Sequence, residues 1–192
     1  MTLANKITSL RLILAPAFFV VYIFPFARAV GGPVPTVVLW ILFIASELTD
    51  LIDGRVARRR KEVSDFGKLF DPFADVLVRI TYFLCFVIDG VLPLIPLLLI
   101  LYREFGILFV RILMMKKGIA MGARIGGKIK AVAYMAAGAL ALLAVSVKRL
   151  GLGESLFWGL RMAAVTVFIV SVVFALLSFA DYIAVLRRQK DE

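Results

Sequence analysis

The chain has no histidine and one cysteine, and charged residues make up only 19% of its 192 residues. The lack of histidine removes the commonest general base of enzymes and the usual nitrogen ligand of metal ions. The single cysteine, Cys85, has no partner for an internal disulfide and lies in an apolar run, so we expect it to pack as a small apolar residue. Any metal ion bound here is therefore expected to have oxygen ligands.

Hydrophobic residues make up 62% of the chain, and the mean hydropathy is +1.00. Because soluble domains average roughly 25% charged residues, we interpret the chain as an integral membrane protein. About 20 residues cross a bilayer as a helix, so the apolar stretches predict an all-α fold of about six transmembrane helices in one domain, 1–192. These stretches are 7–26, 34–52, 66–88, 91–115, 129–147 and 156–185.

The net charge of +10 could indicate nucleic acid, but no basic soluble module can be isolated, so we expect no nucleic-acid partner. Basic residues beside membrane helices mark the cytoplasmic side and attract anionic headgroups. Placing both termini and the segments 55–68 and 116–130 on one side gathers most of the Lys and Arg there. The count predicts a multi-pass protein of the cell (inner) membrane with cytoplasmic termini.

The first helix has a second interpretation. Lys6 and Arg11 precede an apolar run that ends in Ala27-Arg28-Ala29, which is also the pattern of a cleaved signal peptide. Both readings, a retained helix and a removed one, are open at this point.

Four carboxylates interrupt the apolar pattern: Asp50 and Asp53, then Asp71 and Asp75. One carboxylate at mid-membrane costs about 2.5 to 3.5 kcal/mol on insertion scales, so the group needs compensation. On a helix the first pair is about 60° apart around the axis and the second about 40°. If a short linker folds the two helices antiparallel, the faces meet near the cytoplasmic boundary. Two divalent cations, Mg²⁺ or Mn²⁺, would cancel the charge, with all four aspartates as metal ligands.

Small residues accompany these carboxylates. Gly54, Ala57 and Gly67 leave both helices without bulk, and a helical glycine costs ~1 kcal/mol relative to alanine. Their positions indicate close approach of a ligand or, alternatively, of a neighbouring backbone. Arg58 suits a phosphate oxygen because a guanidinium offers bidentate geometry, whereas the basic residues at 59–61 are expected to face headgroups.

The pattern D-x-x-D-G-x-x-A-R, eight residues, G-x-x-x-D-x-x-x-D resembles the signature of the CDP-alcohol phosphotransferase family, with every position filled. The stretches N-K-I-T-S-L-R, R-E-F, G-G-K-I-K and S-F-A-D-Y extend the similarity over most of the chain and look like the phosphatidylglycerolphosphate synthase branch. In one departure, Val76 follows Asp75 where that branch usually has lysine, and Arg79 lies one turn beyond. The matched residues are Asp50, Asp53, Gly54, Ala57, Arg58, Gly67, Asp71 and Asp75.

The resemblance implies transfer of the phosphatidyl group from CDP-diacylglycerol to sn-glycerol 3-phosphate, giving phosphatidylglycerol phosphate and CMP by two-metal-assisted phosphoryl transfer. It implies that Asp75 is both a metal ligand and the base toward the acceptor hydroxyl. Gly54, Ala57, Arg58 and Gly67 would line the CDP pocket. The resemblance also implies that the protein forms a homodimer and that membrane lipids surround it.

The acceptor carries its own phosphate and needs cations. Candidates in or beside the connection between the fourth and fifth helices are Arg111, Arg124, Lys128 and Lys130, with the two arginines first because a planar fork suits phosphate. Simple contact with lipid headgroups is the alternative for each.

Other functions stay open from sequence alone. Another acceptor (inositol phosphate, serine, phosphatidylglycerol or a choline-type alcohol) fits the same chemistry, and a small ion or proton transporter or a lipid-binding scaffold is the remote alternative. The further charges Glu47, Arg103, Glu104 and Asp181 are expected either in buried pairs or as partners of the metal-binding residues, and the sequence does not assign their partners. The aromatic residues are expected mainly at the membrane interface and toward lipid.

Overall fold

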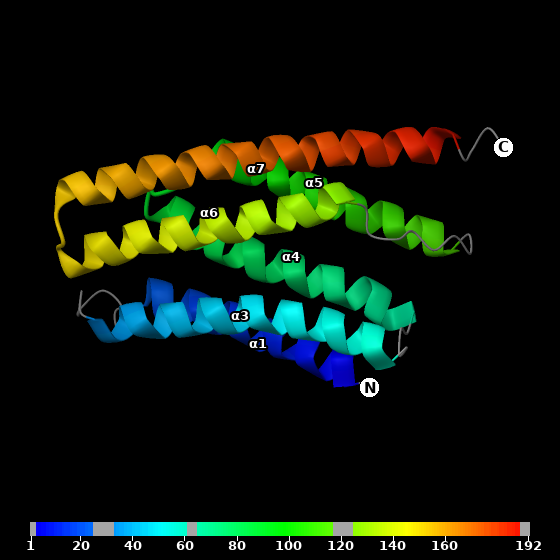
Figure 1. Ribbon diagram of the computed structural model, residues 1–192, viewed down its shortest axis with the longest axis horizontal. Helices are drawn as coiled ribbons and strands as arrows, with labels where there is room; N and C mark the ends of the chain where they lie inside the picture. The colour runs from blue at the N-terminus through cyan, green and yellow to red at the C-terminus, as the bar shows by residue number, and fades with distance from the viewer. Residues whose placement is uncertain (1–2, 25–32, 61–64, 117–124, 189–192) are drawn as a thin grey trace.

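The computed structural model describes residues 3–24, 33–60, 65–116 and 125–188, and the side chains of 8–24, 33–50, 67, 70–115, 130–180 and 183. All of the regular structure in these residues is helical, so the all-α prediction is confirmed (Figure 1). The helices are α1 (Leu3–Ile23), α3 (Pro33–Arg60), α4 (Asp65–Ile88), α5 (Leu94–Lys116), α6 (Ile125–Leu150) and α7 (Glu154–Arg188).

The helices run back and forth along one long axis (Figure 1). The first residues of α1, α4 and α6 and the last residues of α3, α5 and α7 lie at one end, which we call the terminal end. The opposite end, the turn end, contains the short connections after α4 and α6. Helix α1 packs on α3 and α4, and α6 packs most extensively on α7. The even, alternating topology therefore brings both signature segments to the terminal end.

The sequence underestimated the length of α3. The predicted stretch 34–52 follows hydrophobicity, but the helix continues to Arg60. Alanine and arginine are good helix formers, so the polar signature segment stays helical although it is not apolar. At the turn end, by contrast, α5 begins at Leu94 instead of 91, because Gly90 adopts a positive φ of 72° and a turn occupies the residues before Pro93.

Three helices in the described part of the chain are long and apolar enough to cross a membrane: Pro33–Asp50, Lys130–Leu150 and Glu154–Ala180. A shorter apolar stretch, Thr8–Ile23, lies in α1. Helices α4 and α5 are of similar length but carry several charged residues among their apolar ones. Among their described side chains, Asp75 pairs with Arg79 and Arg103 pairs with Glu104 inside the bundle, so composition alone understates how apolar these two helices are.

An aromatic cluster forms much of the core. Phe83 and Phe168 are fully buried with ring centroids 4.8 Å apart, and Tyr82 and Phe86 pack beside them. Other aromatic residues, among them Phe73, Phe109 and Trp158, are exposed on the surface of the bundle, as expected of side chains that face lipid. Small residues on α6 leave room that only large rings fill, which hydrophobicity along the chain does not reveal. Cys85 is fully buried and free, which confirms its predicted packing role.

Helix α1 is built into this core. Tyr22 donates a hydrogen bond to Asp89 at 2.9 Å, and Arg149 donates to the carbonyl of Tyr22 at 3.1 Å. The Arg149 guanidinium also lies 4.6 Å from the centre of the Tyr22 ring. The first helix thus packs as an integral part of the bundle, which favours the retained over the cleaved reading.

Gly138 on α6 offers a test of this packing. A Cβ at this position would lie 3.0 Å from Cε2 of Phe43 and 3.2 Å from Cε2 of Tyr82. Because both neighbours are buried rings, we expect Gly138→Val to lower the stability of the detergent-purified protein by about 1–3 kcal/mol, seen as a lower melting temperature. Gly159→Val on α7 is the matched control, since nothing lies within 4 Å of its Cβ position. Equal melting temperatures for the two variants would contradict the packing described.

Candidate active site

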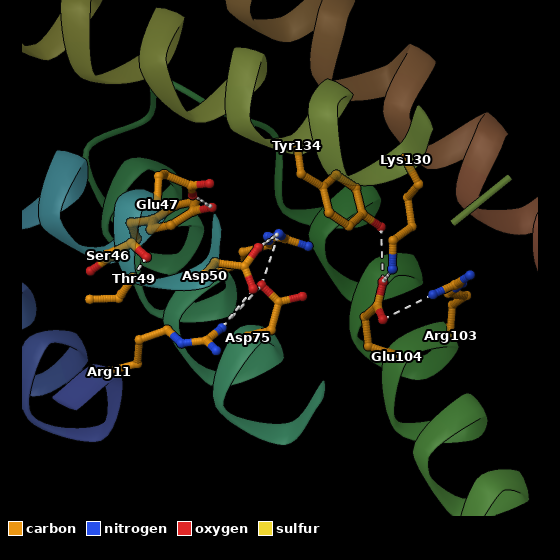
Figure 2. Close-up of polar contacts among 12 residues, drawn as sticks. Arg11, Ser46, Glu47, Thr49, Asp50, Asp75, Arg103, Glu104, Lys130 and Tyr134 are labelled. Atoms are coloured by element: carbon orange, nitrogen blue, oxygen red, sulfur yellow. Dashed lines mark hydrogen bonds and ion pairs between the residues drawn. The ribbon is translucent and has the colours of Figure 1, made fainter. Parts of the chain in front are cut away.

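Two of the four signature carboxylates converge between α3 and α4, with Arg11 of α1 beside them (Figure 2). Nη1 of Arg11 lies 2.9 Å from Oδ1 of Asp50 and 3.9 Å from Oδ1 of Asp75. Nη2 of Arg79 lies 2.8 Å from Oδ1 of Asp75 and 3.6 Å from Oδ2 of Asp50. Each guanidinium therefore bridges both carboxylates.

The charges of this site are layered. The side chains of Arg11 and Arg79 are 1% and 7% exposed, whereas those of Asp50 and Asp75 are 36% and 26% exposed. A buried guanidinium is costly unless it is paired, so each arginine depends on the carboxylates in front of it. The guanidiniums of Arg11 and Arg79 lie on the buried side of the site, and the carboxylates of Asp50 and Asp75 remain accessible from outside.

Asp71 lies one turn before Asp75 on α4 and contacts α1. Its Oδ1 accepts a hydrogen bond from the hydroxyl of Thr8 at 2.7 Å. Thr8 and Arg11 are three positions apart, so they share one face of α1. The first helix thus supports carboxylates from both signature helices, which explains its close packing on α3 and α4.

The carboxylates fit a divalent metal site in their chemistry. Within the described residues, no group of three or more His, Cys, Asp or Glu side chains is close enough to hold a metal ion. The side chain of Asp53, the fourth signature aspartate, lies outside that set. Asp50 and Asp75 already share positively charged atoms, and oxygen-only donors of this kind suit Mg²⁺ or Mn²⁺. Asp50 and Asp75 thus offer the type of oxygen donor that such an ion takes, and a complete set of ligands stays a prediction.

Several predicted site residues fall outside the described side chains. Gly54, Ala57 and Arg58 lie on the last turns of α3, and Lys128 lies on the first turn of α6. Arg124 lies outside the described residues altogether. Gly67 is described and is buried in the first turn of α4. The roles assigned to these residues stay predictions.

The two described candidates for the acceptor phosphate differ in their surroundings. Arg111 on α5 is half-buried, and its Nε has no hydrogen-bond partner within the described part of the chain. Lys130 is buried on α6, and its Nζ lies 2.5 Å from Oε1 of Glu104. The ammonium of Lys130 is thus already paired with a carboxylate, whereas Arg111 forms no ion pair within the described part of the chain.

Glu104 is the centre of a second buried group, which we call the Glu104 cluster: Arg103 and Glu104 of α5 with Lys130 and Tyr134 of α6 (Figure 2). Arg103 donates to Glu104 at 2.9 Å and to the carbonyl of Ala175 on α7 at 3.1 Å. Tyr134 donates to Glu104 at 3.3 Å. The cluster joins three helices and supplies the partners that the sequence did not assign.

Other residues of the site were missed or left without partners by sequence reasoning. From the sequence, Arg11 was treated only as a basic residue that precedes the first apolar run, and Thr8 and Tyr134 were not singled out. Glu47, whose partner was left open, accepts a hydrogen bond from Tyr82 at 3.1 Å. A charged side chain within an apolar helix needs a partner, so the position of Arg11 was a usable signal. Asp181 falls outside the described side chains.

Comparison with known families gives one match over most of the chain. Residues 1–177 match the profile of the CDP-alcohol phosphatidyltransferase family. The matched range includes both signature helices and the Glu104 cluster.

Similar curated proteins come from several bacteria. The chain is 40% identical to the CDP-diacylglycerol--glycerol-3-phosphate 3-phosphatidyltransferase of Treponema pallidum (strain Nichols), over 95% of this chain and 88% of that protein. It is 35% identical to the protein of the same name from Bacillus subtilis (strain 168), over 73% and 76% of the two chains. It is 30% identical to the probable phosphatidylglycerophosphate synthase of Mycobacterium tuberculosis (strain H37Rv), over 95% and 80%.

The hydroxyl of Thr8 should matter for cation binding because it donates to Asp71. We expect Thr8→Val, which removes the donor at similar volume, to weaken binding of Mn²⁺ by about 10-fold, as is typical when the partner of a metal-binding carboxylate is lost. The measurement is titration of the purified protein with Mn²⁺, followed by electron paramagnetic resonance of the free ion. Thr8→Ser keeps the hydroxyl and should bind as the wild type does. Identical affinities in all three proteins would remove Asp71 from the site.

Proposed function

The chain belongs to the CDP-alcohol phosphatidyltransferase family, and we propose that it transfers the phosphatidyl group of CDP-diacylglycerol to sn-glycerol 3-phosphate, giving phosphatidylglycerol phosphate and CMP. The observation that carries the proposal is the 40% identity over 95% of the chain with a relative that bears this activity in its name. The paired carboxylates of Asp50 and Asp75, toward the terminal end of α3 and α4, support the proposal because they suit transfer of a phosphate-linked group.

The donor is a pyrophosphate, which a cluster of bare carboxylates would repel. Divalent cations, Mg²⁺ or Mn²⁺, held by Asp50, Asp53, Asp71 and Asp75 would neutralise the pyrophosphate and the departing CMP. We propose two such ions, since two cancel the formal charge of four carboxylates. The buried guanidiniums of Arg11 and Arg79 hold Asp50 and Asp75 in place from behind.

Asp75 is the residue that we assign to the acceptor hydroxyl. It lies beside Asp50 and is partly exposed, so a ligand can reach it. The chain has no histidine, and a carboxylate is the base that remains. Asp75 takes the hydroxyl proton as the oxygen of glycerol 3-phosphate forms a bond to the lipid-bearing phosphorus. The bond from that phosphorus to CMP breaks, and CMP leaves.

The remaining predicted residues complete this proposal. Gly54, Ala57, Arg58 and Gly67 would line the pocket of the CDP group. For the phosphate of the acceptor we place Arg111 and Arg124 first, because a planar guanidinium suits phosphate. The other proposed phosphate contacts are Lys128 and Lys130.

We further propose that residues 1–192 form one membrane domain, with all six helices spanning the cell membrane and the terminal end in the cytoplasm. The abundance of Lys and Arg at that end supports this orientation. Helices α4 and α5 can span because their charges pair inside the bundle. The site then lies where a lipid donor and a water-soluble acceptor meet. We also propose a homodimer, on family resemblance alone.

The reaction can be tested by measuring CMP release. Detergent-purified protein with CDP-diacylglycerol and Mg²⁺ or Mn²⁺ should release CMP when glycerol 3-phosphate is added. Inositol phosphate, serine, phosphatidylglycerol and a choline-type alcohol should each support little turnover in its place. Turnover with only one of these others would contradict the proposed acceptor while leaving the family chemistry intact.

The same assay tests the role of Asp75. Asp75→Asn keeps the shape of the side chain but cannot accept the proton, so turnover should fall by about 10²-fold or more. Asp89→Asn is the matched control, because Asp89 lies at the turn end and contacts Tyr22. Near-normal turnover by Asp75→Asn would exclude it as the base.

A further inference from the structure

The ring of Tyr134 lies between two buried cations. Nζ of Lys130 is 5.2 Å from the ring centre, and Cζ of Arg79 is 5.8 Å from it. Lys130 belongs to the Glu104 cluster, whereas Arg79 pairs with Asp75 and Asp50. Tyr134 is 1% exposed, so no water layer separates it from these groups. The ring therefore forms the boundary between two groups of buried charges.

Each side of this boundary has its own charge balance. Glu104 accepts hydrogen bonds from Lys130 and from Arg103, so the Glu104 cluster holds two cations for one carboxylate. On the other side, Arg11 and Arg79 face Asp50 and Asp75, two cations for two carboxylates. A guanidinium on a flexible stem pairs with whichever carboxylate it can reach. The Tyr134 ring packs against the Arg79 guanidinium and limits the positions that this guanidinium can take beside Asp75 and Asp50.

We infer that Tyr134 is a positioning residue for the active site: its ring keeps Arg79 on Asp75 and Asp50. The inference rests on the proposed function, in which Asp75 accepts the proton. Contact of both cations with the ring is favourable, because both are attracted to the π-electrons. The Tyr134 hydroxyl donates to Glu104 at a long 3.3 Å and orients the ring. The ring, more than the hydroxyl, is the part that acts.

Removal of the ring has two consequences of opposite sign. Arg79 loses its contact with the ring and gains room to move, so Asp75 is held less firmly by its closest cation, and turnover falls. At the same time a guanidinium that is held less firmly competes less well with metal ions for the carboxylates. Divalent ions should then bind more tightly. A site that was merely loosened would lose turnover and metal affinity together.

The experiment compares Tyr134→Leu and Tyr134→Phe with the wild-type full chain in detergent. For Tyr134→Leu we expect kcat to fall about 10-fold, KM for both substrates to stay within about twofold, and the Kd for Mn²⁺ without substrate, measured by electron paramagnetic resonance, to fall about threefold. Tyr134→Phe keeps the ring, so its kcat and its Kd for Mn²⁺ should be close to the wild-type values. Tyr22→Phe is the matched control, since it removes a phenol–carboxylate hydrogen bond at the turn end.

Three results would overturn the inference: wild-type kcat in Tyr134→Leu, weaker Mn²⁺ binding in that variant, or equal losses in Tyr134→Phe. If Tyr134→Leu does not purify in a folded state, Arg79→Lys decides the matter, because lysine keeps the charge but lacks the fork that bridges two carboxylates. Its kcat should fall about 10-fold, and an unchanged kcat would overturn the inference. A wild-type protein that releases no CMP with glycerol 3-phosphate would instead contradict the proposed function.

Discussion

Two arginines shared between two carboxylates are the interaction on which the rest of this structure depends. Arg11 and Arg79 each contact both Asp50 and Asp75, and these four residues come from α1, α3 and α4. Neither the cations nor the anions could be buried alone in an apolar bundle without a large cost in free energy. The pairing therefore fixes the contact of three helices and sets the two carboxylates side by side.

Buried charge is confined to a few places in this bundle. Besides the carboxylate site, the Glu104 cluster joins α5, α6 and α7, and Tyr22 with Asp89 and Arg149 closes the turn end. Between them lies an aromatic core of rings packed on small residues. Helices α4 and α5 look too polar to enter a membrane, but Asp75 pairs with Arg79, and Arg103 pairs with Glu104, inside the bundle. The polar contacts specify which helices meet, and the apolar surface outside them suits lipid.

The sequence predicted the helical class, the alternating topology and the neighbouring placement of Asp50 and Asp75, because hydrophobic runs and helical spacing are local properties. Helix ends were less accurate: α3 continues to Arg60 through a segment that is polar but helix-forming. The partners of Glu47, Arg79 and Glu104 could not be predicted, since pairing across helices depends on rotation about each helix axis. Rotation about the helix axes also decides which aromatic residues form the core, so the sequence did not predict them.

At one end of the membrane bundle, the carboxylate oxygens of Asp50 and Asp75 lie against the buried guanidiniums of Arg11 and Arg79. The central claim is that α3 and α4 form one shared carboxylate site. Anomalous diffraction from crystals grown with Mn²⁺ tests this claim most directly. The account predicts manganese density between α3 and α4, about 2.0–2.2 Å from oxygens of Asp50 and Asp75, a distance typical of small divalent ions. Manganese bound elsewhere, or the two aspartates turned apart with Arg11 and Arg79 on other partners, would contradict it.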